Sequence, residues 1–271
     1  MKKILKRIRD VFQRNLVAKI DSLESELRQL SRKVQLDNIC ITPFNNFGIS
    51  IDGTIYPCCN SWCQHYAFGN IFESDFQSVW NSDKAKEFRR TIWDGTYKYC
   101  LRGKCFPAWG PKSDIIADYV NDGTMLRAPK SVDFSHDQTC NVLCTTCRSK
   151  PVINSPERQE MLDRLIEKTF LPLCKDAEKV YINGSGEVFA SSNSRKLVMQ
   201  IAKRYPDISF HIHSNGVLCD EENLKNLGIL YRTSAFTISI HAATKETYNQ
   251  IVRGGDFDRV MKNVNYLAQL R

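Results

Sequence analysis

Three cysteines within eight residues constrain this chain more than any other feature. Cys140, Cys144 and Cys147 have the spacing C-x3-C-x2-C, and they closely follow a strand-like stretch at residues 131–135. Three soft thiolates on one tight loop can ligate three irons of a cubane [4Fe–4S] cluster, whereas an electron-transfer cluster normally takes four cysteines. The fourth iron would then be free to bind and activate another molecule.

The C-x2-C part of this spacing, Cys144 to Cys147, also occurs in two other kinds of site. A C-x2-C pair is found in zinc knuckles and in redox-active thiol pairs. A thiol oxidoreductase built on Cys144 and Cys147 is the least favoured interpretation, because Cys140 and the surrounding loop have no role in it.

Four further motifs follow the cysteine loop, each at the end of an expected strand. They are residues 181–187, residues 213–216, residues 237–241 and residues 248–255. In this order, and together with the cysteine loop, they resemble the motifs of radical S-adenosylmethionine (SAM) enzymes. The resemblance covers residues 131–271. Thr146 departs from it, because many members carry an aromatic residue next to the third cysteine.

The resemblance implies a set of residues that hold the cofactors. The metal ligands would be Cys140, Cys144 and Cys147, and the SAM-binding residues would be Gly184, Gly186, Glu187, Ser214, Asn215, Ser239 and Arg253. The two glycines would let the backbone approach the methionine end of SAM closely. Glu187 would accept a charge-assisted hydrogen bond from the ammonium group, and Ser239 and Arg253 would contact the carboxylate or the ribose. No catalytic side chain is assigned.

The chemistry that this resemblance implies is radical chemistry. One electron enters the [4Fe–4S] cluster, SAM is cleaved reductively, and the resulting radical abstracts a hydrogen atom from the substrate. We therefore expect a radical SAM oxidoreductase or modifying enzyme that acts on a peptide, a sugar or a small metabolite, with an electron donor such as flavodoxin or ferredoxin. The alternative is a non-catalytic interaction or scaffold protein, stabilised by zinc or iron–sulfur, with a decayed half-barrel.

Composition limits the compartment. The chain has 271 residues, of which 42% are hydrophobic and 25% charged, as in soluble globular proteins. It contains no apolar run long enough for a transmembrane helix, and its start lacks the pattern of a signal peptide. Eleven cysteines without an export signal indicate a reducing cytoplasm and metal ligation. Cys174 and Cys219 stand apart from the other cysteines and are expected to be buried apolar residues.

The net charge of +8 is concentrated at the start of the chain. Residues 1–20 hold seven Lys and Arg against one Asp, a balance of +6, so the other residues carry only +2. A basic surface for nucleic acid over the main body is therefore not expected.

Residues 1–36 are predicted to form one long helix, basic and amphipathic at its start. Its later apolar residues alternate in steps of four and three, as in a short coiled coil. They are Leu16, Ile20, Leu23, Leu27, Leu30 and Val34. Three roles are open for this helix: packing on its own domain, self-association, or peripheral contact with an anionic membrane surface.

Residues 37–110 are predicted to form a small cysteine-rich α+β unit. Asp52 and Gly53, between alternating apolar residues, predict a hairpin. The unit resembles a SPASM domain, the auxiliary iron–sulfur module of many radical SAM enzymes, although here it precedes the barrel. This likeness is carried by the Gly53-x4-Cys58 spacing, the Cys58–Cys59 pair, residues 68–71 and the helix around residues 79–81.

The SPASM-like unit is expected to hold a second metal site, because so small a unit has little core without a metal. The expected ligands are Cys40, Cys58, Cys100 and Cys105, with Cys59 and Cys63 in reserve. The spacing of the cysteines alone does not distinguish a second iron–sulfur cluster from a four-cysteine zinc site with the same ligands.

After a linker at residues 111–130, the chain alternates strands and helices, which predicts an α/β fold with a parallel sheet. Strands are expected near residues 131–136, 178–183, 208–213 and 235–241, and helices near residues 156–169, 194–204, 220–228 and 244–270. These four βα units over residues 131–271 would form a partial (β/α) radical SAM barrel. Because the family barrel has six or more units, we expect a C-terminally truncated chain or a barrel completed by another chain.

Polar and apolar residues alternate along the expected strands. Asp133, His211, His213, Thr237 and Ser239 fall on one face, and apolar residues fall on the other. Buried parallel strands usually carry continuous apolar runs instead. The polar face is therefore expected to line a cavity for SAM and substrate.

Overall fold

The computed structural model describes residues 19–20, 22–23, 25–26, 37–59, 63, 65–101, 105, 107–182 and 185–270. Most of the helix predicted for residues 1–36 lies outside these described residues. Its described pieces are helical, and the side chains of Ile20 and Leu23 are about half exposed, at 47% and 50%.

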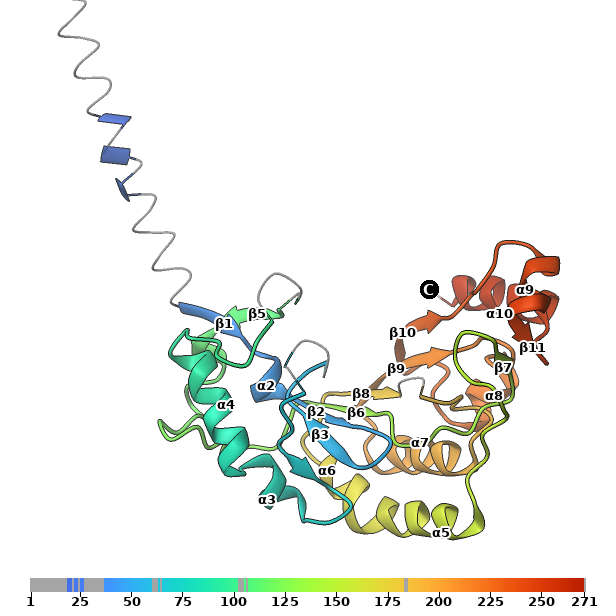
Figure 1. Cartoon of the computed structure of the whole chain (residues 1–271), viewed down its shortest axis with the longest axis horizontal. Coiled ribbons are helices and arrows are strands. Elements are labelled where there is room, and N and C mark those ends of the chain that lie inside the picture. Colours follow the sequence, from blue (N-terminus) through green and yellow to red (C-terminus); the bar gives the residue numbers. More distant parts are fainter. Residues whose placement is uncertain are drawn as a thin grey trace, which may run out of the picture.

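One seven-stranded sheet runs through the molecule (Figure 1). In spatial order its strands are β10 (Thr233–Ile238), β9 (Ser209–Ser214), β8 (Lys179–Ile182), β6 (Ser131–Phe134), β2 (Asn46–Ile49), β3 (Thr54–Tyr56) and β4 (Gly69–Asn70). The strands from β10 to β2 are parallel, and β3 and β4 extend the sheet in antiparallel fashion. The α/β fold with a parallel sheet is therefore confirmed, and each of the four strands predicted after residue 130 is present.

Strand β2 connects the cysteine-rich segment to the α/β part of the chain. It pairs in parallel with β6, so that Phe47 lies opposite Val132 and Ile49 lies opposite Phe134. These four side chains are buried in one continuous apolar core. The two segments therefore share a sheet and a core. The predicted hairpin between β2 and β3 is confirmed, and Gly53 in its turn has a φ of +82°.

Helices cover the lower face of the sheet in Figure 1. They are α5 (Pro156–Leu165), which continues through the π-helical turn η2 (Ile166–Phe170) into α6 (Leu171–Leu173), then α7 (Ser192–Arg204) and α8 (Glu221–Asn226). Side chains of Ser155, Ser191 and Asp220 accept backbone hydrogen bonds at the starts of α5, α7 and α8. Such caps satisfy amide groups that have no partner within the helix, and so fix where each helix begins.

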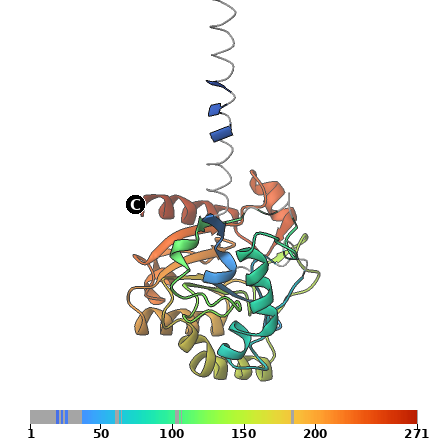
Figure 2. The same ribbon diagram turned by 90° about the vertical axis from the view of Figure 1, so that its left-hand side faces the viewer.

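The cysteine-rich segment forms the end of the molecule away from β10 (Figure 1, Figure 2). It contains β1 (Asn38–Cys40), α2 (Thr42–Asn45), α3 (Phe76–Trp80), α4 (Asp83–Trp93) and β5 (Trp109–Pro111), which pairs with β1. Arg89 of α4 is fully buried, donates from Nε to the Pro43 carbonyl at 3.0 Å, and lies 4.0 Å from the Trp80 ring centre. Burial lowers the pKa of Arg89 to about 9. This side chain therefore joins α4 to both α2 and α3.

Residues 111–130, the expected linker, pack against the rest of the protein. The segment begins with the short 3₁₀ helix η1 (Lys112–Asp114). Beyond it, Ile115, Tyr119 and Met125 are buried in the main apolar core. The segment therefore contributes to the core as well as connecting two parts of the chain.

The single helix predicted for residues 244–270 is wrong. The structure has two helices, α9 (Lys245–Ile251) and α10 (Phe257–Gln269), separated by the short strand β11 (Val252–Arg253). Gly254 has a φ of +78°, a left-handed conformation that ends the strand and that glycine adopts without steric cost. The interruption lets β11 pair with β7 (Leu143–Cys144) inside the cysteine loop.

Alternation of side chains along the strands agrees with the predicted two-faced sheet. Burial alternates along β6, β8 and β9, with the apolar residues fully buried against the helices. On the other face His211 and His213 each share a hydrogen bond of 2.9 Å with the next strand, through Thr237 and Ser239 respectively. Burial is the largest cause that lowers the pKa of both histidines. This face is therefore polar, and lowering of the pKa favours the neutral form of both histidines.

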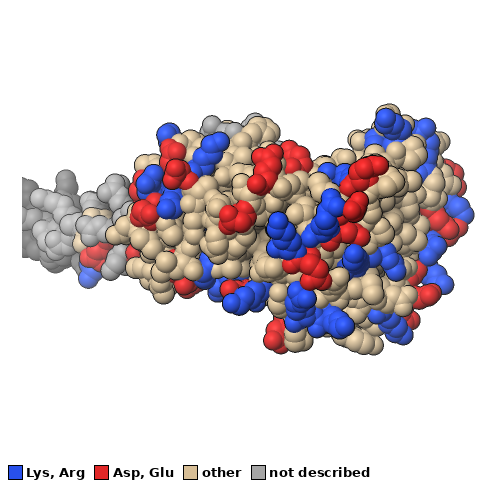
Figure 3. Space-filling model, turned by 90° about the horizontal axis from the view of Figure 1, so that it is seen from below, with Lys and Arg blue, Asp and Glu red and all other residues tan. Residues whose placement is uncertain are grey.

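Charge on the helical face is mixed. In the view from below, Lys and Arg alternate with Asp and Glu and form no large area of one sign (Figure 3). Ion pairs join neighbouring helices, as between Lys196 and Asp163 at 3.1 Å and between Arg204 and Glu167 at 3.2 Å. None of the described helices is long and apolar enough to cross a membrane.

Candidate functional site

The cysteine loop begins where β6 ends and is held by a turn at Asp137. One carboxylate oxygen of Asp137 accepts from the Thr139 amide at 2.8 Å, and the other accepts a short hydrogen bond from the Ser191 hydroxyl. Ser191 caps α7, so the buried Asp137 fixes the start of the loop to the start of that helix. Three residues later the chain reaches Cys140.

The three cysteines of the loop lie close enough to affect one another electrostatically. Cys144 is buried, Cys140 is half-buried and Cys147 is exposed, and none forms a disulfide. Burial is the largest cause that raises the pKa of Cys144, and Cys140 and Cys147 raise it further. The Cys144 thiol is therefore protonated at neutral pH, and a metal that binds there displaces its proton.

The next motif, residues 181–187, packs directly on the cysteine loop. Gly184 lies outside the described residues. A Cβ atom on Gly186 would lie 2.4 Å from the Thr139 carbonyl oxygen, too close for any side chain. The amide of Glu187 donates to the same carbonyl at 2.8 Å. The glycine is thus needed where the two backbones meet.

The Glu187 carboxylate holds the turn after β9. It is 2% exposed, and it accepts from the Ser214 hydroxyl at 2.9 Å and from the Asn215 amide at 2.7 Å. A weaker bond comes from the Phe189 amide at 3.4 Å. Burial raises the pKa of Glu187 to about 7, although these hydrogen bonds act in the opposite direction.

The raised pKa of Glu187 predicts a pH-dependent stability. Because the pKa rises from 4.5 to about 7, the folded state holds this proton more tightly than the unfolded state. The free energy of unfolding should therefore fall, by about 3 kcal/mol, as the pH rises through this window. Denaturant unfolding of the metal-free protein at about pH 5 and about pH 8 measures the change.

Two variants isolate this contribution. Glu187→Gln should lose the part of the pH dependence that belongs to Glu187, whereas Glu222→Gln, which changes an exposed carboxylate, should keep it. An unaltered pH dependence in Glu187→Gln would show that another group is responsible.

Asn215 connects the turn after β9 to the cysteine loop. Its side-chain amide donates to Asn141 Oδ1 at 2.8 Å and to Cys140 Sγ at 3.8 Å. Its own oxygen accepts from the Val217 amide at 3.0 Å, which fixes the direction of the NH₂ group. The predicted site residues Ser214 and Asn215 are therefore brought together with Glu187 and Cys140.

Arg148 completes the contacts among these loops. One guanidinium nitrogen donates to the Gln138 carbonyl at 2.8 Å. The other donates to the Ser185 carbonyl at 2.9 Å and lies 3.5 Å from Cys147 Sγ. Arg148 thus ties the end of the cysteine loop both to its own start and to the glycine-containing loop.

The other two predicted residues lie at the ends of the site. Ser239 follows β10; its amide donates to the Ser214 carbonyl at 2.9 Å, and its hydroxyl is the partner of His213. Arg253 is exposed on β11, and its backbone is paired with Leu143 of the cysteine loop. Both therefore stand beside the loops that hold the cysteines.

The donor set of the loop fits a multinuclear cluster. Within the described residues, no three histidine, cysteine or carboxylate side chains stand as ligands around a single metal ion. Three thiols on one loop are the ligand type that iron–sulfur clusters take, one thiolate to each iron. In the apolar cluster that contains Cys144, the Tyr248 hydroxyl is buried without a hydrogen-bond partner among the described residues. A metal-bound thiolate would offer that hydroxyl an acceptor.

A second group of thiols forms in the cysteine-rich segment. Cys58 shares a hydrogen bond with Cys63, and this bond is the largest cause that raises the pKa of Cys58 and lowers that of Cys63. Cys40 and Cys100 also raise the pKa of Cys58. Burial is the largest cause that raises the pKa of Cys105. The thiols of Cys40, Cys59 and Cys63 raise it further. Each of the six cysteines of the segment is therefore within electrostatic range of at least one other, Cys59 and Cys63 included.

Several of these residues were not predicted from the sequence. An aspartate two residues before a threonine is a common turn pattern, so the role of Asp137 was open to prediction. Nothing in the sequence separates Arg148 from an ordinary solvated arginine. Cys63 was assigned only a reserve role, because its approach to Cys58 depends on the fold of the segment.

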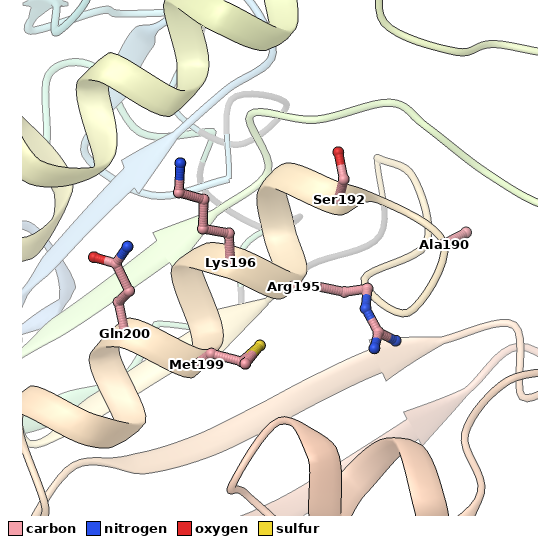
Figure 4. A pocket seen from close by; sticks show the side chains of 6 residues that line it. All are labelled: Ala190, Ser192, Arg195, Lys196, Met199 and Gln200. Carbon is pink, nitrogen blue, oxygen red and sulfur yellow. The ribbon is translucent and has the colours of Figure 1, made fainter.

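The helical face also carries an open hollow of about 460 Å³, away from the cysteines (Figure 4). Its lining residues project from α7 and the turn before it; they are Ala190, Ser192, Arg195, Lys196, Met199 and Gln200. None of them is a predicted site residue. The hollow is therefore separate from the residues that the sequence predicts as the site.

Two sequence families match the chain. A model described as the radical SAM superfamily matches residues 134–271, which is half of the chain. A model named SPASM and described as an iron–sulfur cluster-binding domain matches residues 40–106. The two matched ranges contain the two groups of cysteines described above.

A curated relative and two solved structures are also similar. The S-adenosyl-L-methionine-dependent 2-deoxy-scyllo-inosamine dehydrogenase of Niallia circulans is 30% identical over 80 residues, 26% of this chain and 32% of the relative. The chain thus spans about a third of that relative's length. BtrN in complex with AdoMet and 2-DOIA has 19% identity and a TM-score of 0.31, over 45% of this chain and 50% of that one. TYW1 with a lysine–pyruvate adduct bound has 19% identity and a TM-score of 0.30, over 48% of each chain.

Proposed function

Because the chain belongs to the radical SAM superfamily, we propose that it is an oxidoreductase or modifying enzyme that abstracts a hydrogen atom from a peptide, a sugar or a small metabolite. Members of this family use a [4Fe–4S] cluster and SAM, and the SPASM domain binds a further iron–sulfur cluster. The name of the curated relative, a dehydrogenase, favours oxidation among these reactions.

The observation that carries the proposal is the meeting of three loops around three thiols. Glu187 joins the glycine-containing loop to the turn after β9, Asn215 joins that turn to the cysteine loop, and Arg148 joins the cysteine loop back to the glycine-containing loop. Such a closed set of contacts holds Cys140 and Cys147 in position before the cofactors bind. The cluster and SAM, when bound, supply the radical chemistry that side chains alone do not provide.

Within this proposal, Glu187 acts mainly on its own protein. Ser214, Asn215 and Phe189 already occupy its carboxylate oxygens. A hydrogen bond to the ammonium group of SAM, as the family resemblance implies, would have to compete with these donors. We propose that Glu187 fixes the turn that carries Asn215.

The polar face of the sheet supports a hydroxylated or otherwise hydrogen-bonding substrate. Tyr181 and His211 stand side by side there, with ring centres 5.2 Å apart. His213 and Ser239 lie farther along the same face, next to the turn that carries Asn215. Imidazole, phenol and hydroxyl groups can bind and orient such a substrate through hydrogen bonds.

For the SPASM domain we propose ligands drawn from Cys40, Cys58, Cys63 and Cys100, with Cys105 and Cys59 at the edge of the group. This proposal differs from the sequence-based set in giving Cys63 a ligand role. Cys63 is fully buried, and it shares a hydrogen bond with Cys58. Cys59 is exposed.

Alanine variants of these cysteines should separate the two clusters. Cys58→Ala and Cys63→Ala should each lower the iron content from about eight to about four per chain, while the signal of the SAM-binding cluster remains. Cys174→Ala, at a buried cysteine outside both groups, should leave the iron content unchanged. Iron and sulfide assays after anaerobic reconstitution measure the effect; a full complement in Cys63→Ala would return that residue to a reserve role.

The enzymatic proposal is tested by measuring the cleavage of SAM in the absence of a second substrate. Anaerobically purified protein, reduced chemically and given SAM, should be brown and should release 5′-deoxyadenosine and methionine. A colourless protein that holds stoichiometric zinc and leaves SAM intact would favour the non-catalytic alternative.

A further inference from the structure

Two cysteines of the SAM-cluster loop have a hydrogen-bond donor beside them, and the third shares an apolar cluster with a buried hydroxyl. Asn215 Nδ2 lies 3.8 Å from Cys140 Sγ, and a guanidinium nitrogen of Arg148 lies 3.5 Å from Cys147 Sγ. Tyr248 packs in the same apolar cluster as Cys144, with a buried hydroxyl that has no partner among the described residues. The three donors come from three different elements of the fold.

Two of these donors are held in place by other contacts. Arg148 is fixed by the Gln138 and Ser185 carbonyls, so that its guanidinium is not free to turn away from Cys147. The Asn215 amide is fixed through Asn141. Donors held in this way lose little conformational entropy when an acceptor becomes available.

Tyr248 is held by close packing. A Cβ atom on Gly255 would lie 2.8 Å from the Tyr248 hydroxyl oxygen, so the glycine leaves room for the ring at this point. The ring is 1% exposed. A buried hydroxyl without a partner costs stability, and a negatively charged thiolate at Cys144 would remove that cost.

We propose that Asn215, Tyr248 and Arg148 donate one hydrogen bond each to the sulfurs of Cys140, Cys144 and Cys147, and that these bonds raise the reduction potential of the bound cluster. The inference rests on the proposed function, because it assigns the three cysteines to the SAM-binding cluster. Its physical basis is that reduction adds negative charge to the cluster, and donors on the sulfurs stabilise that charge. Arg148 contributes a positive charge as well as an N–H group.

Redox titrations of the reconstituted protein, followed by electron paramagnetic resonance, test this proposal. The signal that changes when SAM is added identifies the cluster concerned. Arg148→Gln and Tyr248→Phe should each move its midpoint potential to a more negative value, and the double variant should move it further. Arg148→Lys, which keeps the charge and loses the planar fork, should fall between Arg148→Gln and the unchanged protein.

Matched controls lie outside the donor set. Lys150→Gln removes one positive charge from an exposed side chain of the same loop, and Tyr231→Phe removes one hydroxyl from a ring that is 88% exposed. Both should leave the potential unchanged. Equal potentials in Arg148→Gln, Tyr248→Phe and the two controls, with full iron content, would overturn the proposal.

A measurement on the unchanged protein covers the case in which a variant fails to assemble. Exchange of H₂O for D₂O should shift the iron–thiolate stretching bands of the SAM-binding cluster in resonance Raman spectra, because its sulfurs accept exchangeable hydrogens. Bands that do not shift would also overturn the donor set. If SAM changes no cluster signal in the electron paramagnetic resonance spectrum, the proposed function is contradicted instead. The two failures are therefore distinguishable.

Discussion

Cys144→Ala should abolish SAM cleavage and remove the SAM-binding cluster, leaving about four of about eight irons per chain. Cys144 is the buried member of the loop, and its backbone pairs with Val252 of β11. Both other cysteines of the loop interact electrostatically with its thiol. Without it, only two thiols remain for three irons. The rate of 5′-deoxyadenosine formation, measured with reduced protein and SAM, should fall to the background level.

The control for this loss is a second cysteine that is equally buried and lies elsewhere. Cys174→Ala should keep both the iron content and the rate of SAM cleavage, since Cys174 is outside both groups of thiols. Cleavage at an undiminished rate in Cys144→Ala would remove the cysteine loop from the chemistry.

Gly186→Ala should separate the glycine-containing loop from the cysteine loop. Its Cβ atom would lie 2.4 Å from the Thr139 carbonyl oxygen and 2.7 Å from the Gln138 carbonyl carbon, and backbone at this point cannot move without breaking the bond from the Glu187 amide. Forcing a methyl group into such a contact costs about 1 to 3 kcal/mol. We expect that loss in denaturant unfolding, together with weaker binding of SAM.

Gly48→Ala is the matched control for Gly186→Ala. A Cβ atom on Gly48 would meet its neighbours at 3.8 to 4.0 Å, an ordinary contact distance. It should therefore unfold like the unchanged protein and bind SAM equally well. If Gly186→Ala proves as stable as Gly48→Ala, the close packing of the two loops has no energetic weight.

The four strands after residue 130 and the position of the cysteine loop could be predicted from local patterns. The C-x3-C-x2-C spacing and the alternation along β6 and β9 involve residues that are close together in the sequence. They can therefore be recognised without knowledge of the tertiary fold. The break between α9 and α10 is also local, but the two glycines that cause it lie within a strongly amphipathic stretch. Helical periodicity on both sides therefore hid the short strand β11.

The shared sheet could not be predicted, because it depends on the pairing of strands far apart in the sequence. Phe47 of β2 lies opposite Val132 of β6, and no local sequence pattern in either strand indicates that the two strands pair. The same holds for Arg148, whose partners are carbonyl groups at Gln138 and Ser185. Backbone acceptors carry no sequence signature, so only the fold shows that this arginine is fixed.

The Glu187 side chain illustrates how a motif can mark a position without fixing its contacts. The family resemblance predicts that the Glu187 carboxylate contacts SAM, and in the structure this carboxylate accepts from the Asn215 amide at 2.7 Å. A buried carboxylate needs several donors to offset its desolvation. The nearest donors are those of its own protein, and sequence spacing does not reveal them.

The central claim is that Cys140, Cys144 and Cys147 hold a cluster with one iron open to SAM. The most direct test is electron paramagnetic resonance of the reduced, reconstituted protein before and after SAM is added, with Cys144→Ala alongside. We predict that SAM changes the shape and position of one cluster signal in the unchanged protein, and that this signal is missing from Cys144→Ala. A spectrum that SAM leaves unaltered, in protein with its full iron content, would contradict the claim.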